Sequence, residues 1–219
     1  AEQPNSRWYA GCGIYRNVRM VTTAEVFVEY TGTYITTPEV DDTEATTHAT
    51  VTVTNKSGVE QTITLTNTIV DKMGKEIVDS SSTTTIATGA SVDVESDMIV
   101  PQPTLWDIDN PYLYAMHTTI DVDGNIVDSY TTPFGIRTFE FNADTGFWLN
   151  GRNMKLLGVC MHHDMGALGT AIHRRALQRQ LEILRSFGVN AIRTSHNPPA
   201  PELLELCDQM GFLVMDEAF

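Results

Sequence analysis

The chain has 219 residues, of which 42% are hydrophobic and 8% aromatic, and its formal net charge is -14 at pH 7. This apolar content suits one large or two small domains with buried cores and excludes an intrinsically disordered chain. No apolar run approaches the roughly 18 residues that cross a membrane, so no membrane partner is expected. The strong negative charge argues against nucleic acid as a partner.

The cysteines and the N-terminus leave the cellular compartment open. Cys12, Cys160 and Cys207 lie far apart without a CxxC pattern, which argues against a disulfide framework or a thiolate zinc site. The first residues carry no signal-peptide pattern, so either there is no export signal or the chain begins after it. Cytoplasmic and periplasmic or secreted locations both fit.

Charge and patterning divide the chain into three parts, at residues 1–23, 24–139 and 140–219. The middle part holds 4 basic and 18 acidic residues, whereas both flanking parts are close to neutral. Apolar and polar residues alternate along segments such as 49–54, which is typical of a strand with one buried face. About seven such short segments, separated by turn residues, predict an immunoglobulin-like all-β sandwich. On the residues alone, this domain is a spacer or a binding module.

The third part changes from alternation to a helical period. Leucines at 177, 181 and 184 form one face of a helix, for which Thr170 is a candidate N-cap and Gly188 a candidate stop. A second helix is predicted from Pro201 to Gly211. Short apolar runs at 155–159, 189–192 and 212–215 flank these helices. The order β-α-β-α-β predicts a parallel sheet covered by helices.

Polar residues follow each of these three predicted strands. The C-terminal ends of parallel strands meet at one edge of a sheet, where α/β proteins build their sites. The side chains expected there are those of His162, His163, Asp164, Arg193, Ser195, His196, Asp216 and Glu217. Without a glycine-rich loop after the first strand, a dinucleotide site is not expected.

Several motifs resemble glycoside hydrolase family 2, which includes β-galactosidases, β-glucuronidases and β-mannosidases. The most specific are Arg-Thr-Ser-His-Asn-Pro-Pro at 193–199 and Met-Asp-Glu-Ala at 215–218. Segments 110–114 and 134–137 resemble the end of the family's immunoglobulin-like domain, and segment 7–18 resembles the last strand of its N-terminal sugar-binding jelly-roll domain. The resemblance implies a multidomain fold: the tail of that jelly roll, the sandwich, and the first β/α units of a truncated (β/α)8 TIM barrel.

The resemblance also implies an activity and an incomplete catalytic centre. Family members are retaining exo-β-glycosidases that hydrolyse terminal non-reducing β-linked sugars of a glycoside or oligosaccharide substrate. The acid/base glutamate follows an asparagine after the fourth barrel strand, and the sequence contains no Asn-Glu dipeptide. Both catalytic glutamates are therefore expected beyond Phe219, in a parent enzyme of which this chain is an inactive fragment. A β-galactosidase is favoured because no uronate-binding motif is visible.

By resemblance, His162, Arg193 and His196 contact the substrate or orient the nucleophilic carboxylate. The non-functional alternatives are that His162 is a structural histidine at a strand end and that Arg193 and His196 belong to a loop ion pair. Asp216 and Glu217 are expected to support the site, because neighbours on one strand point apart and cannot flank one glycosidic bond.

No metal is expected at His162-His163-Asp164 for the same reason, and no cofactor is required. Magnesium or sodium in the full-length enzyme, and its assembly into a homo-oligomer, are left open. The alternative to a glycosidase is a non-catalytic β-sandwich module that binds carbohydrate or protein, or serves as a spacer.

Overall fold

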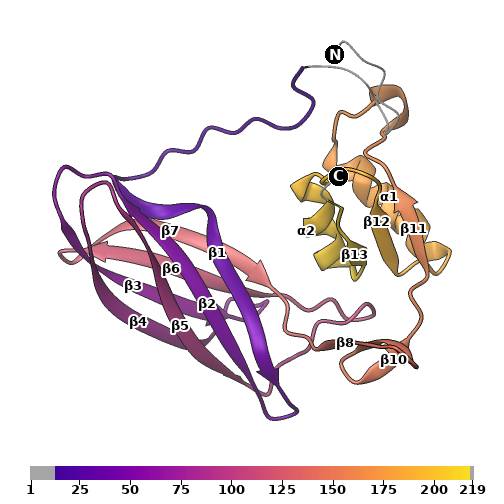
Figure 1. Ribbon diagram of the computed structural model, residues 1–219, viewed down its shortest axis with the longest axis horizontal. Coiled ribbons are helices and arrows are strands. Elements are labelled where there is room, and N and C mark those ends of the chain that lie inside the picture. The colour runs from indigo at the N-terminus through magenta and orange to yellow at the C-terminus, as the bar shows by residue number, and fades with distance from the viewer. Residues whose placement is uncertain (1–12, 218–219) are drawn as a thin grey trace. The chain divides into compact units, whose positions relative to one another are not determined.

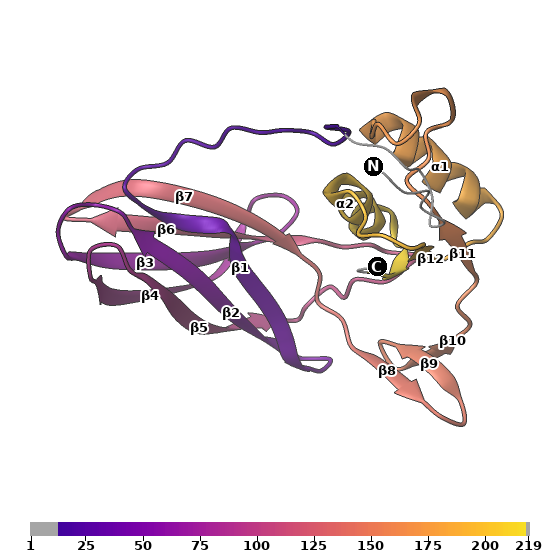
Figure 2. The same ribbon diagram turned by 45° about the horizontal axis from the view of Figure 1, so that its top comes forward.

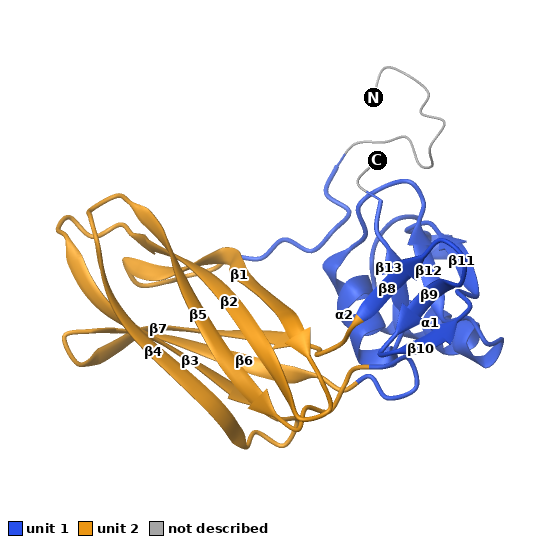
Figure 3. Cartoon of the chain, turned by 60° about the horizontal axis from the view of Figure 1, so that its bottom comes forward, with its two compact units in different colours: residues 1–20, 107–111, 139–219 blue, residues 21–106, 112–138 orange. Residues whose placement is uncertain are grey.

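The computed structural model describes residues 13–217, so the predicted features at residues 7–12 and at Phe219 lie outside the described part. The described chain forms two compact units (Figure 3). The first unit, drawn in orange and labelled unit 2 in Figure 3, contains residues 21–106 and 112–138. The second unit, drawn in blue and labelled unit 1 there, contains residues 13–20, 107–111 and 139–217. No helix among the described residues is long and apolar enough to cross a membrane.

The first unit is the expected sandwich of two antiparallel sheets (Figure 1). Three strands form one sheet in the order β1-β2-β5, with bounds Val26–Val40, Glu44–Asn55 and Ser91–Pro101. Four strands form the other in the order β4-β3-β6-β7. Their bounds are Glu76–Ile86, Gln61–Val70, Tyr114–Val122 and Asn125–Phe134.

Alternation along β3 shows why this sequence forms a sandwich. Ile63, Leu65 and Ile69 are almost completely buried in the core between the sheets. On the outer face, the Thr62 hydroxyl lies 3.0 Å from that of Thr85 on β4, and two similar hydroxyl pairs follow along the strands. β-branched threonines suit a pleated outer surface, so one sequence pattern supplies both the core and the hydrated face.

A small antiparallel sheet follows the sandwich and was not predicted (Figure 2). It consists of β8 (Phe139–Asn142), β9 (Gly146–Leu149) and β10 (Arg152–Met154), in the order β10-β9-β8. Phe147 and Leu149 are buried, and the indole nitrogen of Trp148 donates to the Thr145 hydroxyl at 2.8 Å.

The β-α-β-α-β segment has the predicted parallel topology. Strands β11 (Gly158–Met161), β12 (Ala191–Thr194) and β13 (Leu213–Met215) form the sheet in that order. The connections contain a short 3-10 helix, η1 (Gly166–Leu168), then α1 (Arg174–Ser186) and α2 (Pro201–Met210). Leucines of both helices pack with Ile192 in a second core. The predicted multidomain fold class is therefore confirmed.

Several element boundaries differ from prediction, and β12 is shifted by two residues, to Ala191–Thr194 from the predicted run at 189–192. Helix α1 begins at Arg174 with His173 at its N-cap, so Thr170 does not cap it. The first strand starts at Gly158 rather than at 155, and Leu156 and Leu157 before it are 42% and 55% exposed. Apolar character alone did not locate the strand start, because pairing with Ala191 determines where the ladder begins.

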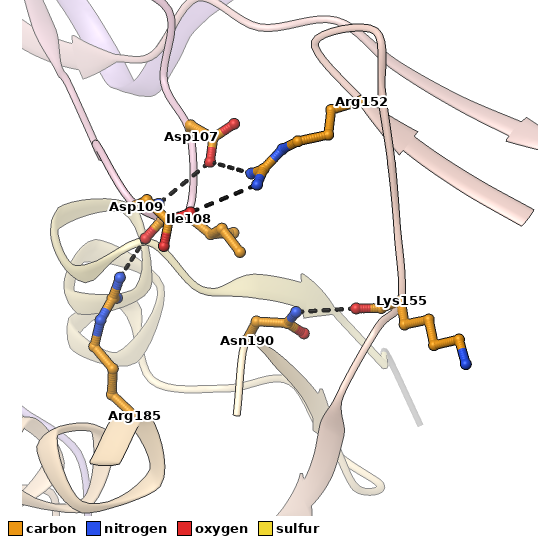
Figure 4. Close-up of polar contacts among 7 residues, drawn as sticks. All are labelled: Asp107, Ile108, Asp109, Arg152, Lys155, Arg185 and Asn190. Atoms are coloured by element: carbon orange, nitrogen blue, oxygen red, sulfur yellow. Dashed lines mark hydrogen bonds and ion pairs between the residues drawn. The ribbon is translucent and has the colours of Figure 1, made fainter. Parts of the chain in front are cut away.

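The loop at residues 107–111, which interrupts the sandwich in sequence, packs within the second unit (Figure 4). Arg152 of β10 lies 2.7 Å from a carboxylate oxygen of Asp107 and 3.6 Å from one of Asp109. Arg185 of α1 donates to the backbone carbonyls of Ile108 and Met210. The loop thus contacts the C-terminal end of α1, which in turn binds the end of α2, just before β13 begins.

Candidate functional site

The strand register brings the predicted polar residues to one edge of the parallel sheet. Cys160 on β11 pairs with Arg193 on β12, which in turn pairs with Met215 on β13. Strands β11 and β12 end one residue beyond these positions, and β13 ends at Met215. His162, His196 and Glu217 therefore leave the sheet at the same edge.

Arg193, His196 and Glu217 form one cluster at this edge. The Glu217 carboxylate makes an ion pair with the Arg193 guanidinium and accepts from His196 Nδ1 at 2.9 Å through its other oxygen. The side chains of Arg193 and His196 are each 41% exposed, whereas that of Glu217 is 17% exposed. The carboxylate therefore lies beneath two groups that remain accessible to a ligand.

The electrostatics of the cluster favour a charged Glu217. Burial by itself would raise the pKa of this carboxyl, but hydrogen bonds from His196 and Arg193 and their charges outweigh burial and lower the pKa. Hydrogen bonds to Cys160 and Glu217 raise the pKa of Arg193. The cluster can therefore present a fixed guanidinium and an imidazole to a hydroxylated or anionic group.

Asp216 points away from this cluster. It accepts from the Thr194 hydroxyl at 3.1 Å, and that hydroxyl accepts from the backbone N–H of Glu217 at 2.9 Å. The carboxylate of Asp216 thus binds Thr194, whereas that of Glu217 binds Arg193 and His196. They do not form a facing pair of carboxyl groups.

His162 lies beside the cluster, with its ring centre 6.0 Å from that of His196 in an edge-on arrangement. It also lines an open hollow of about 420 Å³ together with Asp164, Gly166 and Gln180. His163 instead stacks on Tyr15 at a centroid distance of 6.0 Å. Burial, followed by the charges of Arg16 and His162, lowers the pKa of His163.

Sequence reasoning missed Cys160 as a member of the site. Its sulfur lies 3.7 Å from Arg193 Nη1. The neighbouring side chains of Ser195 and Arg193 lower the pKa of the Cys160 thiol. Cys160 and Arg193 each follow directly after an apolar run, at 155–159 and 189–192. This shared position was the sequence signal that could have placed Cys160 beside Arg193.

The segment at residues 15–19 is a second omission. It lies against the loop that carries His196, although about 180 residues separate the two in sequence. No local pattern indicates such a contact.

Between residues 13 and 217, no group of three or more histidine, cysteine or acidic side chains is placed to hold a metal ion.

Comparisons with known proteins agree with this architecture. The family model described as glycosyl hydrolases family 2 matches residues 26–137, and the model for the TIM barrel domain of the same family matches residues 142–219. The first match begins at β1 and ends just after β7 of the sandwich, and the second begins at the end of β8 and includes the β/α segment.

Individual relatives point the same way. A β-galactosidase of Bacteroides ovatus is 51% identical over the whole chain, and a β-glucuronidase of Bacteroides fragilis is 31% identical over 94% of it. The chain spans 26% and 30% of the lengths of these relatives. It also superposes on a crystal structure of a glycosyl hydrolase family 2 member from Bacteroides cellulosilyticus with a TM-score of 0.92 and 39% identity, covering all of this chain and 30% of that one. With both domain models and these relatives in agreement, the chain belongs to glycosyl hydrolases family 2.

Proposed function

We propose that the chain forms part of a retaining exo-β-glycosidase that removes terminal non-reducing β-linked sugars, most readily β-galactosides. The cluster of Arg193, His196 and Glu217 at the carboxyl ends of neighbouring parallel strands carries this proposal. The 51% identical relative named as a β-galactosidase supports the choice of sugar over glucuronide or mannoside.

Each exposed member of the cluster has a separate role in the proposal. Arg193 orients the nucleophilic carboxylate and keeps it ionised through charge-assisted hydrogen bonds. His196 and His162 contact hydroxyl groups of the sugar, and these contacts strengthen as the oxocarbenium-like transition state forms. Glu217 holds Arg193 and His196 in place from beneath.

The two carboxyl groups that break the glycosidic bond are proposed to lie outside this chain. Retaining hydrolysis needs two carboxyl groups about 5 Å apart, one as acid/base and one as nucleophile. Asp216 is engaged by Thr194, and Glu217 by Arg193 and His196, so these two do not supply that arrangement. Carboxyl chemistry of this kind needs no cofactor.

The test is a substrate panel on the longer protein, using nitrophenyl β-galactoside, β-glucuronide and β-mannoside. We expect the highest kcat/KM on the β-galactoside and no turnover by residues 1–219 alone. Preference for another sugar would overturn the galactoside assignment. No turnover of any of the three would overturn the glycosidase proposal and favour a binding or spacer module.

Single substitutions test the roles of the named residues. His196→Ala in the longer protein should lower kcat/KM by about 100-fold, as expected for a contact that strengthens in the transition state. His117→Ala is the matched control, because His117 is an exposed histidine on β6 of the sandwich, where its Nδ1 lies 2.9 Å from the Thr131 hydroxyl. Equal activities of the two variants would contradict the role of His196.

A further inference from the structure

The loop between β12 and α2 needs support from outside its own backbone. It carries His196 and continues through Asn197, Pro198 and Pro199 to the start of α2. Proline has no N–H to donate, so two successive prolines can be held only through their carbonyls and side chains. A group that binds these carbonyls therefore helps to determine where the loop lies.

Arg16 binds both of them. Its Nη1 donates to the carbonyl of Pro199 at 2.8 Å, and its Nη2 donates to the carbonyl of Pro198 at 2.5 Å. The guanidinium is a planar fork with fixed donor directions, so two simultaneous bonds fix orientation as well as distance. A lysine at this position has one compact ammonium and lacks that geometry.

The neighbours of Arg16 reinforce the contact on both sides of the loop. Asn17 Nδ2 donates to Glu202 Oε1 at 2.6 Å, and Arg19 lies 3.6 Å from the same carboxylate, in the first turn of α2. Glu202 is only 8% exposed, so its charge needs such partners. Tyr15 stacks on His163, next to His162.

These contacts define a strap, residues 15–19. The strap contacts His163 after the end of β11, the loop between β12 and α2, and Glu202 in the first turn of α2. We propose that Arg16 is a positioning residue of the sugar-binding site, which through the strap holds the loop so that His196 faces the sugar. The inference rests on the function proposed above and adds to it a determinant that comes from before the sandwich in sequence. Arg16 itself touches the loop backbone and no reacting group.

The first experiment needs no substrate and uses the 219-residue chain. Amide hydrogen exchange is measured on peptides covering 193–203 in the wild type, Arg16→Ala, Arg16→Lys and Arg175→Ala. Arg175→Ala is the matched control, because it removes an arginine that pairs with Glu182 on the outside of α1 at 3.2 Å. We expect exchange in the loop to accelerate by about tenfold or more in Arg16→Ala, partly recover in Arg16→Lys, and stay unchanged in Arg175→Ala.

The second experiment is kinetic and uses the longer protein with nitrophenyl β-galactoside. Misplacement of His196 should lower kcat about 10- to 100-fold in Arg16→Ala with a smaller change in KM, because the affected contact strengthens in the transition state. The melting temperature should remain close to that of Arg175→Ala. A merely structural role of Arg16 would instead lower the melting temperature and leave kcat per folded molecule unchanged, which would overturn the proposal.

The two experiments separate failure of this inference from failure of the proposed function. Loop exchange in Arg16→Ala equal to that in the wild type overturns the inference whatever the enzyme does. If the longer protein cleaves no β-glycoside while the loop still loosens in Arg16→Ala, the proposed function fails. The role of Arg16 for a sugar site then fails with it, and only its hold on the loop remains.

Discussion

Glu217 joins two strands through its two carboxylate oxygens. It lies two residues beyond the end of β13, while Arg193 and His196 belong to β12 and the loop behind it. A neutral side chain of the same shape would keep hydrogen bonding but lose the attraction to the guanidinium. The acid is therefore more than a space-filling residue at the strand end.

The pH dependence of stability should reveal this ion pair. Because the folded protein lowers the pKa of Glu217, the charged carboxylate contributes stability above the unfolded-state pKa of about 4.3, and this contribution disappears as the pH falls through the folded-state pKa. Glu217→Gln should thus be less stable than the wild type at pH 7, and the difference should be smaller at pH 3. Urea unfolding at both pH values measures it.

An exposed pair on one helix provides the comparison for Glu217. Glu182→Gln breaks the contact with Arg175, both of whose partners are at least 41% exposed, and should change stability little at either pH. A Glu217→Gln variant as stable as the wild type at pH 7 would contradict the predicted coupling.

The two described cysteines should differ sharply in reactivity. Burial, followed by the charge of Asp208, raises the pKa of Cys207 to about 12, whereas the neighbouring side chains of Ser195 and Arg193 lower the pKa of the exposed Cys160. At pH 8, iodoacetamide should therefore alkylate Cys160 and leave Cys207 unmodified, as read from the peptides by mass spectrometry.

Substitutions around Cys160 give this prediction a direction. Arg193→Ala should slow alkylation by raising the pKa of the thiol, and Glu217→Gln should speed it by removing a negative charge that raises that pKa. If both variants were alkylated at the wild-type rate, neither Arg193 nor Glu217 would act on the Cys160 thiol.

At the scale of elements, two glycines end the helices of the second unit. Gly188 and Gly211 have φ values of +81° and +75°, which side chains tolerate poorly. They differ in surroundings: a Cβ at Gly188 would meet nothing within 4 Å, whereas one at Gly211 would lie 2.2 Å from the carbonyl oxygen of Ile108. The loop at 107–111 therefore adds a packing constraint to the conformational one.

Alanine substitutions separate the two constraints. Gly188→Ala should cost about 1 kcal/mol from the left-handed backbone alone. Gly211→Ala should cost about 2–4 kcal/mol, because Ile108 must also move. Urea unfolding followed by helical circular dichroism measures both, since all helices of the described chain lie in the second unit. Equal losses of stability in the two variants would mean that Ile108 moves away from the added Cβ at no energetic cost.

The elements that sequence could predict are those with local signals. Pro201 and Gly211 bound α2 as expected, because the first turn of a helix tolerates proline and its end favours glycine. Strands β8 to β10 have three or four residues each, which is too short for a periodic pattern. The prediction of Thr170 as a cap is wrong because an isolated threonine does not determine where the helix turns begin.

The candidate site divides in the same way. His162, Arg193 and His196 could be named from motif resemblance and from their places after apolar runs. The pairing of Glu217 with Arg193 depends on register between separate strands, and the contact of Arg16 with Pro198 spans 182 residues. Neither has a local signature, so only the folded chain brings these residues together.

At the scale of the molecule, the chain has two separate hydrophobic cores. Ile63 is fully buried in the sandwich core, and Leu181 is fully buried in the core of the β/α unit. The units are not independent in sequence, because residues 107–111 leave the sandwich, pack in the other unit and return. We therefore expect loss of the sandwich to release both ends of that loop, and loss of the β/α core to leave the sandwich strands paired.

This connectivity predicts an asymmetry between two core substitutions. Leu181→Ala should cost about 2–5 kcal/mol and accelerate amide exchange in α1, α2 and β12, with little change in β3 and β6. Ile63→Ala should cost a similar amount but accelerate exchange in both units. A loosened sandwich fixes the two ends of the 107–111 loop less firmly, and this loop carries the contacts of Asp107 with Arg152 and of Ile108 with Arg185. Hydrogen exchange with mass spectrometry on both variants decides the matter. Changes confined to the mutated unit in each case would mean that the loop stays docked without the sandwich.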